Sequence, residues 1–122
     1  MPPTLAAGKL AYLLITVDDV ERAAAFYAAV FGWDVRRKDD GRTAFDDGCS
    51  EVSGHFTAGQ PPAGPPGILV NVLVRDVAAT LESAVAAGGA VDEPPWGEPP
   101  ELYARLRDPA GNVVGIFEQG GW

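Results

Sequence analysis

The sequence predicts an α+β fold of two tandem βαβββ modules. Three observations support this prediction. The order strand, helix and three strands occurs twice along the 122 residues. A segment with four prolines and three glycines, Ala58–Gly67, separates the two copies. Stretches of the first copy match stretches of the second in the same order.

The first copy opens with the apolar stretch Lys9–Val17, which predicts a strand because it is short and ends at two aspartates. Asp18 or Asp19 is expected to cap the following helix, which ends at Gly32. Three more strands follow, separated by Asp-Asp-Gly turn signals. They are expected at Asp34–Arg37, Thr43–Phe45 and about Glu51–Thr57.

The second copy repeats this order. An apolar strand, Ile68–Val74, leads into a helix that starts at Arg75 or Asp76 and ends at Gly88-Gly89. The remaining segments are a short strand at Ala90–Asp92, a proline-rich loop at Glu93–Pro100 around Trp96, and strands at Leu102–Leu106 and Asn112–Glu118. The turn signal Asp108–Gly111 joins the last two strands.

The internal repeat has two matching parts. Leu13–Val20 matches Val70–Val77 at an offset of 57, from Val20 to Val77. Asp47–Phe56 matches Asp108–Phe117 at an offset of 61, from Phe56 to Phe117, which pairs Gly54 with Gly115. We therefore predict a single domain over residues 1–122, with module one at about 8–58, a linker at about 58–67 and module two at about 68–119.

The composition narrows the classes of molecule that we expect this protein to bind. The formal net charge is −8, from 17 acidic and 9 basic residues, so the basic surface typical of nucleic-acid binding is missing. No apolar run approaches the length of a membrane span. The single cysteine, Cys49, has no partner within the chain for a disulfide. We expect a cytoplasmic protein that binds neither nucleic acid nor membrane.

Four segments carry a family resemblance: Val17–Ala23, Phe26-Tyr27, Val30–Trp33 and Asp108–Val114. They resemble the vicinal oxygen chelate superfamily, which includes glyoxalase I, bleomycin-binding proteins and extradiol dioxygenases. The resemblance covers nearly the whole chain. It implies the predicted fold, with a curled mixed sheet around a cleft, and pairing into a homodimer. It is specific for the fold and much less specific for an activity.

Metal enzymes of this superfamily place a His or Glu ligand on the first and last strand of each module. Carried over to this chain, these positions are Tyr12, Gly54, Leu69 and Gly115. Leucine and glycine side chains offer no donor atom to a divalent metal, and the chain has one histidine in all. We therefore expect no metal and no cofactor.

Ten residues are expected to line the ligand cleft: Tyr12, Trp33, Gly54, Leu69, Asn71, Trp96, Tyr103, Arg105, Gly115 and Phe117. Within this set Arg105 is suited to hold a carboxylate or phosphate. The repeat pairs His55 with Ile116, which places His55 on the face away from Gly54 and from the cleft. An alternative stays open, in which Glu51, Ser53 and His55 line the cleft after a shift of one residue.

These observations favour a protein that binds a small organic ligand in a metal-free cleft, with drug sequestration as one version. A metal-independent enzyme that uses Tyr12, Arg105 or Glu51 is the alternative. A metal-dependent glyoxalase or dioxygenase is the third. The sequence leaves open whether a reaction is catalysed and assigns no catalytic residue.

Overall fold

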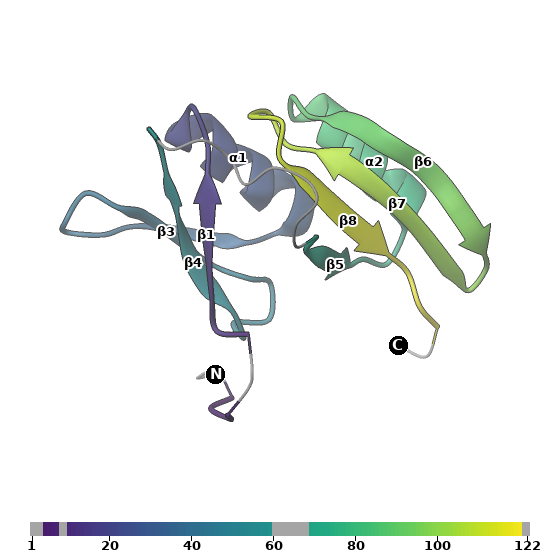
Figure 1. Ribbon diagram of the computed structural model, residues 1–122, viewed down its shortest axis with the longest axis horizontal. Helices are drawn as coiled ribbons and strands as arrows, with labels where there is room; N and C mark the ends of the chain where they lie inside the picture. The colour runs from purple at the N-terminus through teal and green to yellow at the C-terminus, as the bar shows by residue number, and fades with distance from the viewer. Residues whose placement is uncertain (1–3, 8–9, 60–68, 121–122) are drawn as a thin grey trace. The chain divides into compact units, whose positions relative to one another are not determined.

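The computed structural model describes residues 4–7, 10–59 and 69–120. The chain divides into two compact units, Met1–Pro62 and Ala63–Trp122, each with one helix and one four-stranded sheet (Figure 1). Of the linker expected at 58–67, only residues 58 and 59 are among the described residues.

The first unit has the order strand, helix and three strands. Its elements are β1 (Tyr12–Thr16), α1 (Val20–Phe31), β2 (Asp34–Arg37), β3 (Thr43–Asp46) and β4 (Ser53–Thr57). The strand order in the sheet is β1-β4-β3-β2, with β1 parallel to β4 and the other pairs antiparallel.

The second unit repeats this arrangement. Its elements are β5 (Asn71–Leu73), α2 (Val77–Ala86), β6 (Ala90–Glu98), β7 (Glu101–Arg107) and β8 (Val113–Phe117). The strand order is β5-β8-β7-β6, with β5 parallel to β8. The predicted α+β class and the two tandem βαβββ modules are therefore confirmed.

Both helices begin at an aspartate that directly follows a short stretch of extended chain. The carboxylate of Asp19 accepts a hydrogen bond from the backbone N–H of Arg22 at 3.0 Å, and Asp76 accepts one from Ala79 at 3.0 Å. These bonds satisfy amides that have no partner inside a helix. Helix α1 ends at Gly32, whose φ of 70° is the left-handed conformation that glycine adopts at little cost. No helix within the described ranges is long and apolar enough to cross a membrane.

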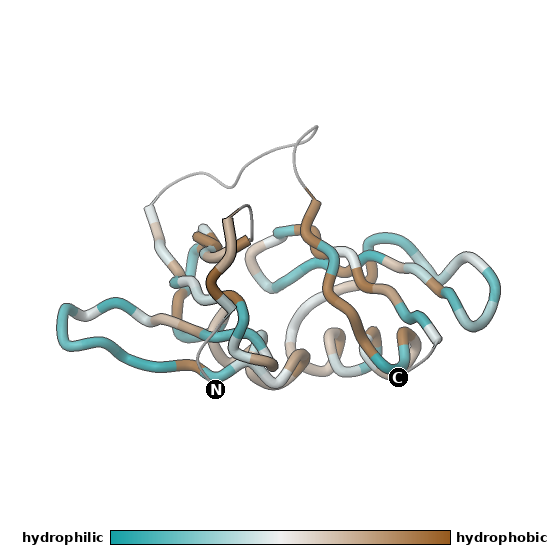
Figure 2. The backbone as a smooth tube through the Cα atoms, turned by 90° about the horizontal axis from the view of Figure 1, so that it is seen from below, coloured by the Kyte–Doolittle hydropathy of each residue, from teal (hydrophilic) through white to brown (hydrophobic). Residues whose placement is uncertain are grey.

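Each sheet packs one face against the helix of its own unit. In the first unit this core is aromatic and contains Phe26, Tyr27, Trp33, Phe45 and Phe56. In the second it is aliphatic and contains Val77, Leu81, Ala84, Ala104, Leu106, Val114 and Ile116. Hydrophilic residues gather at the tips of the β2–β3 and β6–β7 hairpins (Figure 2). We call the opposite side of each sheet its helix-free face.

Strand β6 corrects one part of the sequence prediction. Instead of a short strand followed by a loop at Glu93–Pro100, a single strand extends from Ala90 to Glu98. Among the described strands, β6 lies at the edge of its sheet and pairs with β7 alone. Its prolines therefore leave no hydrogen bond to a second strand unmade. Two shifts of register, between Val91 and Glu93 and between Glu93 and Trp96, accommodate the Pro-Pro pair.

Candidate functional site

The parallel pair β1–β4 sorts the first unit's residues into two faces. Tyr12 lies opposite Ser53, and Leu14 lies opposite His55. The alternate residues of β4 point the other way, since Phe56 is buried and its ring contacts Tyr27 of α1 at a centroid distance of 5.6 Å. Tyr12 and His55 therefore share the helix-free face.

Gly54 lies on the helix-covered face, so its predicted place beside Tyr12 is wrong. A Cβ at this position would collide with the ring of Phe45 and with the carbonyl oxygen of Leu13. Gly54 thus leaves room for the aromatic core. The prediction that His55 lies away from the face of Tyr12 is wrong as well. Ser53 and His55 lie on the helix-free face together with Tyr12, which is the strand register that the alternative required.

One extra residue in a turn explains both errors. The N–H of Asp47 donates to the carbonyl of Val52 at 2.9 Å, whereas that of Asp108 donates to the carbonyl of Asn112 at 2.9 Å. The first turn is one residue longer, and Ser50 within it adopts a φ of 58°. After this turn the repeat changes offset, and a shift of one residue moves every side chain of a strand to the other face.

The corrected counterpart of Gly115 is His55. Leu14 and Asn71 correspond at the offset of 57, and they lie opposite His55 and Gly115 respectively. The two last strands therefore match at an offset of 60, from His55 to Gly115.

Tyr12 and His55 contact each other directly. The Tyr12 hydroxyl and the Nδ1 of His55 are 2.5 Å apart, with ring centroids at 5.6 Å. Tyr12 is 53% exposed and His55 is partly buried. Glu51 lies before β4, where its carboxylate accepts hydrogen bonds from the backbone N–H and hydroxyl of Thr4.

Trp33 does not line the helix-free face. It is 8% exposed and stacks between Tyr27, at a centroid distance of 4.9 Å, and Phe45, at 4.7 Å. Its predicted role as a ligand-binding residue is wrong, because its ring forms part of the core. In the sequence Trp33 directly follows Gly32, and this local pattern does not distinguish a core tryptophan from a ligand-binding one.

The helix-free face of the second sheet carries two rows of side chains that run across its four strands. The residues opposite one another in the first row are Asn71, Gly115, Arg105 and Glu93, which we call the polar row. Those of the second are Leu73, Phe117, Tyr103 and Trp96, which we call the ring row. The rows are two residues apart along each of β5, β7 and β8, or about 6.6 Å.

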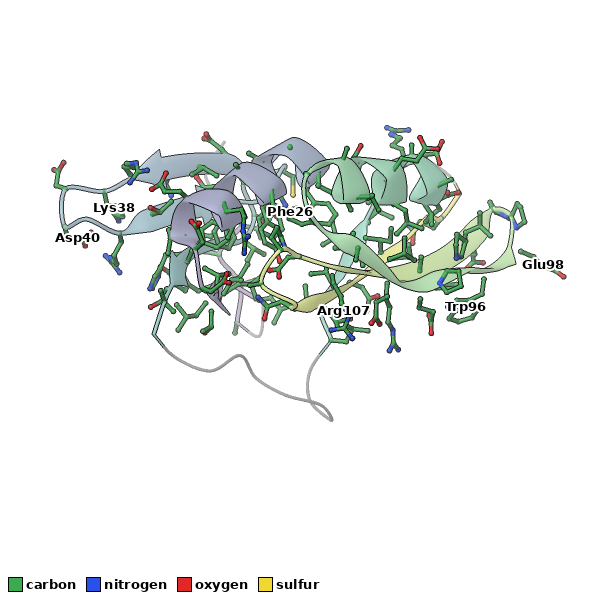
Figure 3. All side chains as sticks on the ribbon, turned by 90° about the horizontal axis from the view of Figure 1, so that it is seen from above. Phe26, Lys38, Asp40, Trp96, Glu98 and Arg107 are labelled. Carbon is green, nitrogen blue, oxygen red and sulfur yellow. The ribbon has the colours of Figure 1, made fainter. Side chains whose placement is uncertain are left out.

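The ring row is a stack of three aromatic side chains. Trp96 and Tyr103 have centroids 4.6 Å apart and planes inclined by 23°, and Tyr103 and Phe117 have centroids 6.4 Å apart and planes inclined by 14°. Trp96 is 54% exposed and its Nε1 donates to Glu93 at 2.6 Å. Trp96 and Arg107 both belong to the sheet that α2 covers from its other side (Figure 3).

The polar row holds two side chains with unused hydrogen-bonding capacity. The Arg105 side chain is 47% exposed, and its Nε lies 3.9 Å from a carboxylate oxygen of Glu93. Arg107, on the same strand face, is bound at 2.7 Å to Asp92 and at 3.2 Å to the carbonyl of Gly111. Asn71 is exposed, and its amide lies over Gly115, where a Cβ would collide with the amide oxygen.

Of the ten predicted site residues, six lie together on this face: Asn71, Trp96, Tyr103, Arg105, Gly115 and Phe117. Leu69 is partly buried and precedes β5. The sequence reasoning missed Leu73 and Glu93. Strand alternation from Asn71 was a signal for Leu73, whereas the assignment of residues 93–100 to a loop concealed Glu93.

The family model described as Glyoxalase/Bleomycin resistance protein/Dioxygenase superfamily matches residues 9–116. The chain belongs to this superfamily. A search of curated proteins finds no match. Solved structures of superfamily members include a glyoxalase/bleomycin resistance protein from Albidiferax ferrireducens T118, which is 22% identical with a TM-score of 0.71 over 91% of this chain and 98% of that one.

Two further solved structures of the same fold are similar to this chain. The hypothetical protein SA1046 from S. aureus is 17% identical, with a TM-score of 0.74 over 93% of this chain and 95% of that chain. The fosfomycin resistance protein FosX from Mesorhizobium loti is 14% identical, with a TM-score of 0.73 over 95% of each chain. At these identities the similarity shows the fold alone.

The positions where metal enzymes of the superfamily hold their ion do not fit a metal in this chain. With the corrected register they are Tyr12, His55, Leu69 and Gly115, which supply one imidazole, one phenol and two side chains without a donor atom. Within residues 4–7, 10–59 and 69–120, no three His, Cys, Asp or Glu side chains are grouped so as to hold a metal ion.

Proposed function

We propose that this protein binds a small organic ligand on the helix-free face of its second sheet, without a metal. The ring row carries this proposal. Sheet faces that meet water are usually polar, whereas this one presents a stack of three aromatic rings that ends in the exposed Trp96. Exposed aromatic surface of this kind is typical of a binding site.

The fold itself does not require these rings. In the first unit the positions that correspond to Leu73 and Phe117 are Thr16 and Thr57, which lie opposite each other on the helix-free face. The same strand pairing therefore forms with two threonines there. This contrast supports a ligand-binding role for the aromatic side chains of the second unit.

The names of two similar proteins refer to antibiotics, one to bleomycin resistance and the other to fosfomycin resistance. Sequestration of a drug is accordingly one version of the proposed function. Because two of the superfamily's four metal positions, Leu69 and Gly115, lack donor atoms here, the ligand is held by side chains alone in this proposal.

The test uses three planar probes with one ring system and different charge: 2-naphthoate, 2-naphthamide and 2-naphthylmethylammonium. We expect at least one probe to shift the indole N–H NMR signal of Trp96 in a saturable manner. Trp96→Ala should weaken that binding about tenfold, because one aromatic contact contributes about 1 kcal/mol. Binding by Trp96→Ala can be followed on the probe's own signals.

The matched control is Val85→Ala, which removes an exposed apolar side chain from α2, on the other side of the same unit. We expect this variant to bind as the unchanged protein does. Absence of any saturable shift with all three probes, or equal losses in Trp96→Ala and Val85→Ala, would contradict the proposed function.

A second candidate function is that of a metal-independent enzyme, and the contact between Tyr12 and His55 favours it. When Tyr12 donates to Nδ1, the imidazole proton resides on Nε2, and the two groups together can relay a proton to a substrate. Nitrogen NMR of this single histidine should show one tautomer, and Tyr12→Phe should mix the two. A mixture already present in the unchanged protein would remove this candidate.

Homodimer formation and a cytoplasmic location remain predictions from the sequence and its resemblance. Sedimentation of the full chain tests the first of them, since a monomeric mass at working concentration contradicts it.

A further inference from the structure

We propose that the ligand bound by the helix-free face of the second sheet is a planar organic acid. Its carboxylate is held between Arg105 and Asn71, and its flat apolar part lies on the ring row. This inference rests on the proposed function and specifies the chemical class of the ligand.

Arg105 provides the charge that recognises a carboxylate. Two arginines occupy this face of β7, and Arg107 is already engaged at 2.7 Å by Asp92. For Arg105 the nearest acidic oxygen, on Glu93, is 3.9 Å away. A guanidinium has five N–H donors in one plane, so most of those on Arg105 remain open to a second carboxylate.

Asn71 provides donors from the other side. Among the described residues its carboxamide has no hydrogen-bond partner, and its oxygen is the amide atom that lies over Gly115. Rotation about the Cβ–Cγ bond would turn the NH2 group, with its two donors, toward a bound carboxylate. Asn71, Gly115 and Arg105 lie opposite one another on β5, β8 and β7, so the two polar residues are about 10 Å apart at the backbone. A carboxylate between the two side chains would accept hydrogen bonds from the Arg105 guanidinium and, after this rotation, from the Asn71 amide.

The orientation of the rings determines how a flat molecule meets them. Trp96, Tyr103 and Phe117 stack face to face across neighbouring strands, so their edges point away from the sheet. Ring edges carry partial positive charge, and a ring that lies flat on them makes the favoured edge-to-face contact. The plane of such a ligand is parallel to the sheet, and an in-plane carboxylate points along the strands to the polar row.

The negative charge of Glu93 would repel a carboxylate bound beside Arg105, and this repulsion makes the proposal testable. Its carboxylate accepts from Trp96 Nε1 at 2.6 Å and faces Arg105. The net charge of −8 also opposes an anion, but charges further away than about 8 Å are screened at physiological salt. Glu93→Gln removes the nearby negative charge while keeping an oxygen for the indole, so it should strengthen carboxylate binding.

The first unit lacks this arrangement. The residues in the corresponding row are Leu14, His55, Ala44 and Arg36. This row has no amide, and its guanidinium, on Arg36, is already bound to Asp46 at 3.2 Å. The pair of Arg105 and Asn71 is therefore a property of the second unit and not a requirement of the repeated fold.

The experiment measures the affinity of the full chain for the three naphthalene probes by NMR titration of the Trp96 indole signal. We expect 2-naphthoate to bind more tightly than 2-naphthamide, and 2-naphthylmethylammonium to bind most weakly. Arg105→Gln should weaken 2-naphthoate about tenfold, since hydrogen bonds to charged groups are the strong ones, and leave 2-naphthamide within about twofold. Glu93→Gln should raise the affinity for 2-naphthoate several-fold.

Arg107→Gln is the matched control, because it removes the same charge from the same strand face at a residue already paired with Asp92. Equal losses in Arg105→Gln and Arg107→Gln would overturn the proposal, since the effect would then be one of net charge. Tighter binding of the amide or the ammonium probe than of 2-naphthoate would also overturn it, while the proposed function would stand. If no probe shifted the Trp96 signal, both the proposed function and the inference that the ligand is a planar acid would be contradicted.

Discussion

The two units share one topology and use their aromatic residues in opposite ways. The first buries Trp33, Phe45 and Phe56 between its sheet and its helix. The second has an aliphatic core and places Trp96, Tyr103 and Phe117 on the helix-free face. The repeat therefore specifies the backbone pairing, while the residues on each face differ independently in the two halves.

The helix-free faces also differ in their polar groups. The first sheet presents the contact between Tyr12 and His55, and the second presents Arg105 and Asn71 around Gly115. If the two units have diverged in this way, loss of an aromatic side chain should mainly affect stability in the first unit and ligand binding in the second.

The largest effect is expected from aromatic truncation. Phe45→Ala removes a fully buried ring that stacks on Trp33, so it should lower the free energy of unfolding by about 3–5 kcal/mol. Tyr103→Ala removes a ring from the other kind of face and should cost much less, about 1 kcal/mol, while it weakens probe binding. Urea denaturation of both variants measures the two losses in free energy of unfolding. Equal losses would contradict the assignment of Phe45 to the core and Tyr103 to the helix-free face.

Next in size is the pair of glycines that the sequence placed in equivalent positions. Gly54→Ala forces a Cβ against the Phe45 ring and the Leu13 backbone, so we expect a loss of about 1–3 kcal/mol. Gly115→Ala displaces only the amide of Asn71, and it should reduce 2-naphthoate affinity with a smaller effect on stability. Denaturation and probe titration separate the two results; a more damaging Gly115→Ala would contradict the assignment of faces.

A smaller effect is expected for the polar contact on the first sheet. Tyr12→Phe removes the hydroxyl that contacts His55 and keeps the ring, and both residues are partly accessible to water. We expect a loss of up to about 1 kcal/mol in the free energy of unfolding. A loss above about 3 kcal/mol would show that this contact is a structural element of the first unit.

The smallest effect is expected from removal of divalent metals. Leu69 and Gly115 offer no ligand atoms, so treatment with EDTA should leave probe affinity and thermal stability unchanged. Elemental analysis of the purified protein is the parallel measurement. A stoichiometric divalent ion whose removal abolishes probe binding would contradict the metal-free proposal.

Much of the fold could be predicted because its signals are local. Asp19 and Asp76, each one of the two residues at which the sequence allowed a helix to start, cap the helices, and Gly32 ends α1. The assignment failed at Glu93–Pro100, because prolines disfavour strands in general and the sequence did not reveal that β6 lies at the edge of its sheet.

The faces of the strands could be predicted where strand alternation alone decided them. Tyr103 and Arg105 were assigned to one face of a strand, and the structure places them there, with Asn71 and Gly115 beside Arg105. Glu93 was missed because its place depends on the shifted register of β6.

The order of the elements, the duplication and the resemblance to the superfamily could be obtained from the sequence, since they follow from short-range patterns along the chain. The place of Gly54 in the core and the contact between His55 and Tyr12 became visible in the tertiary structure. One additional residue in the turn before β4 inverts the whole strand, and no pattern of apolar and polar residues in so short a strand reveals that insertion. The structure alone also distinguished Arg105 from Arg107, because the difference lies in the carboxylates that neighbouring strands bring to each guanidinium.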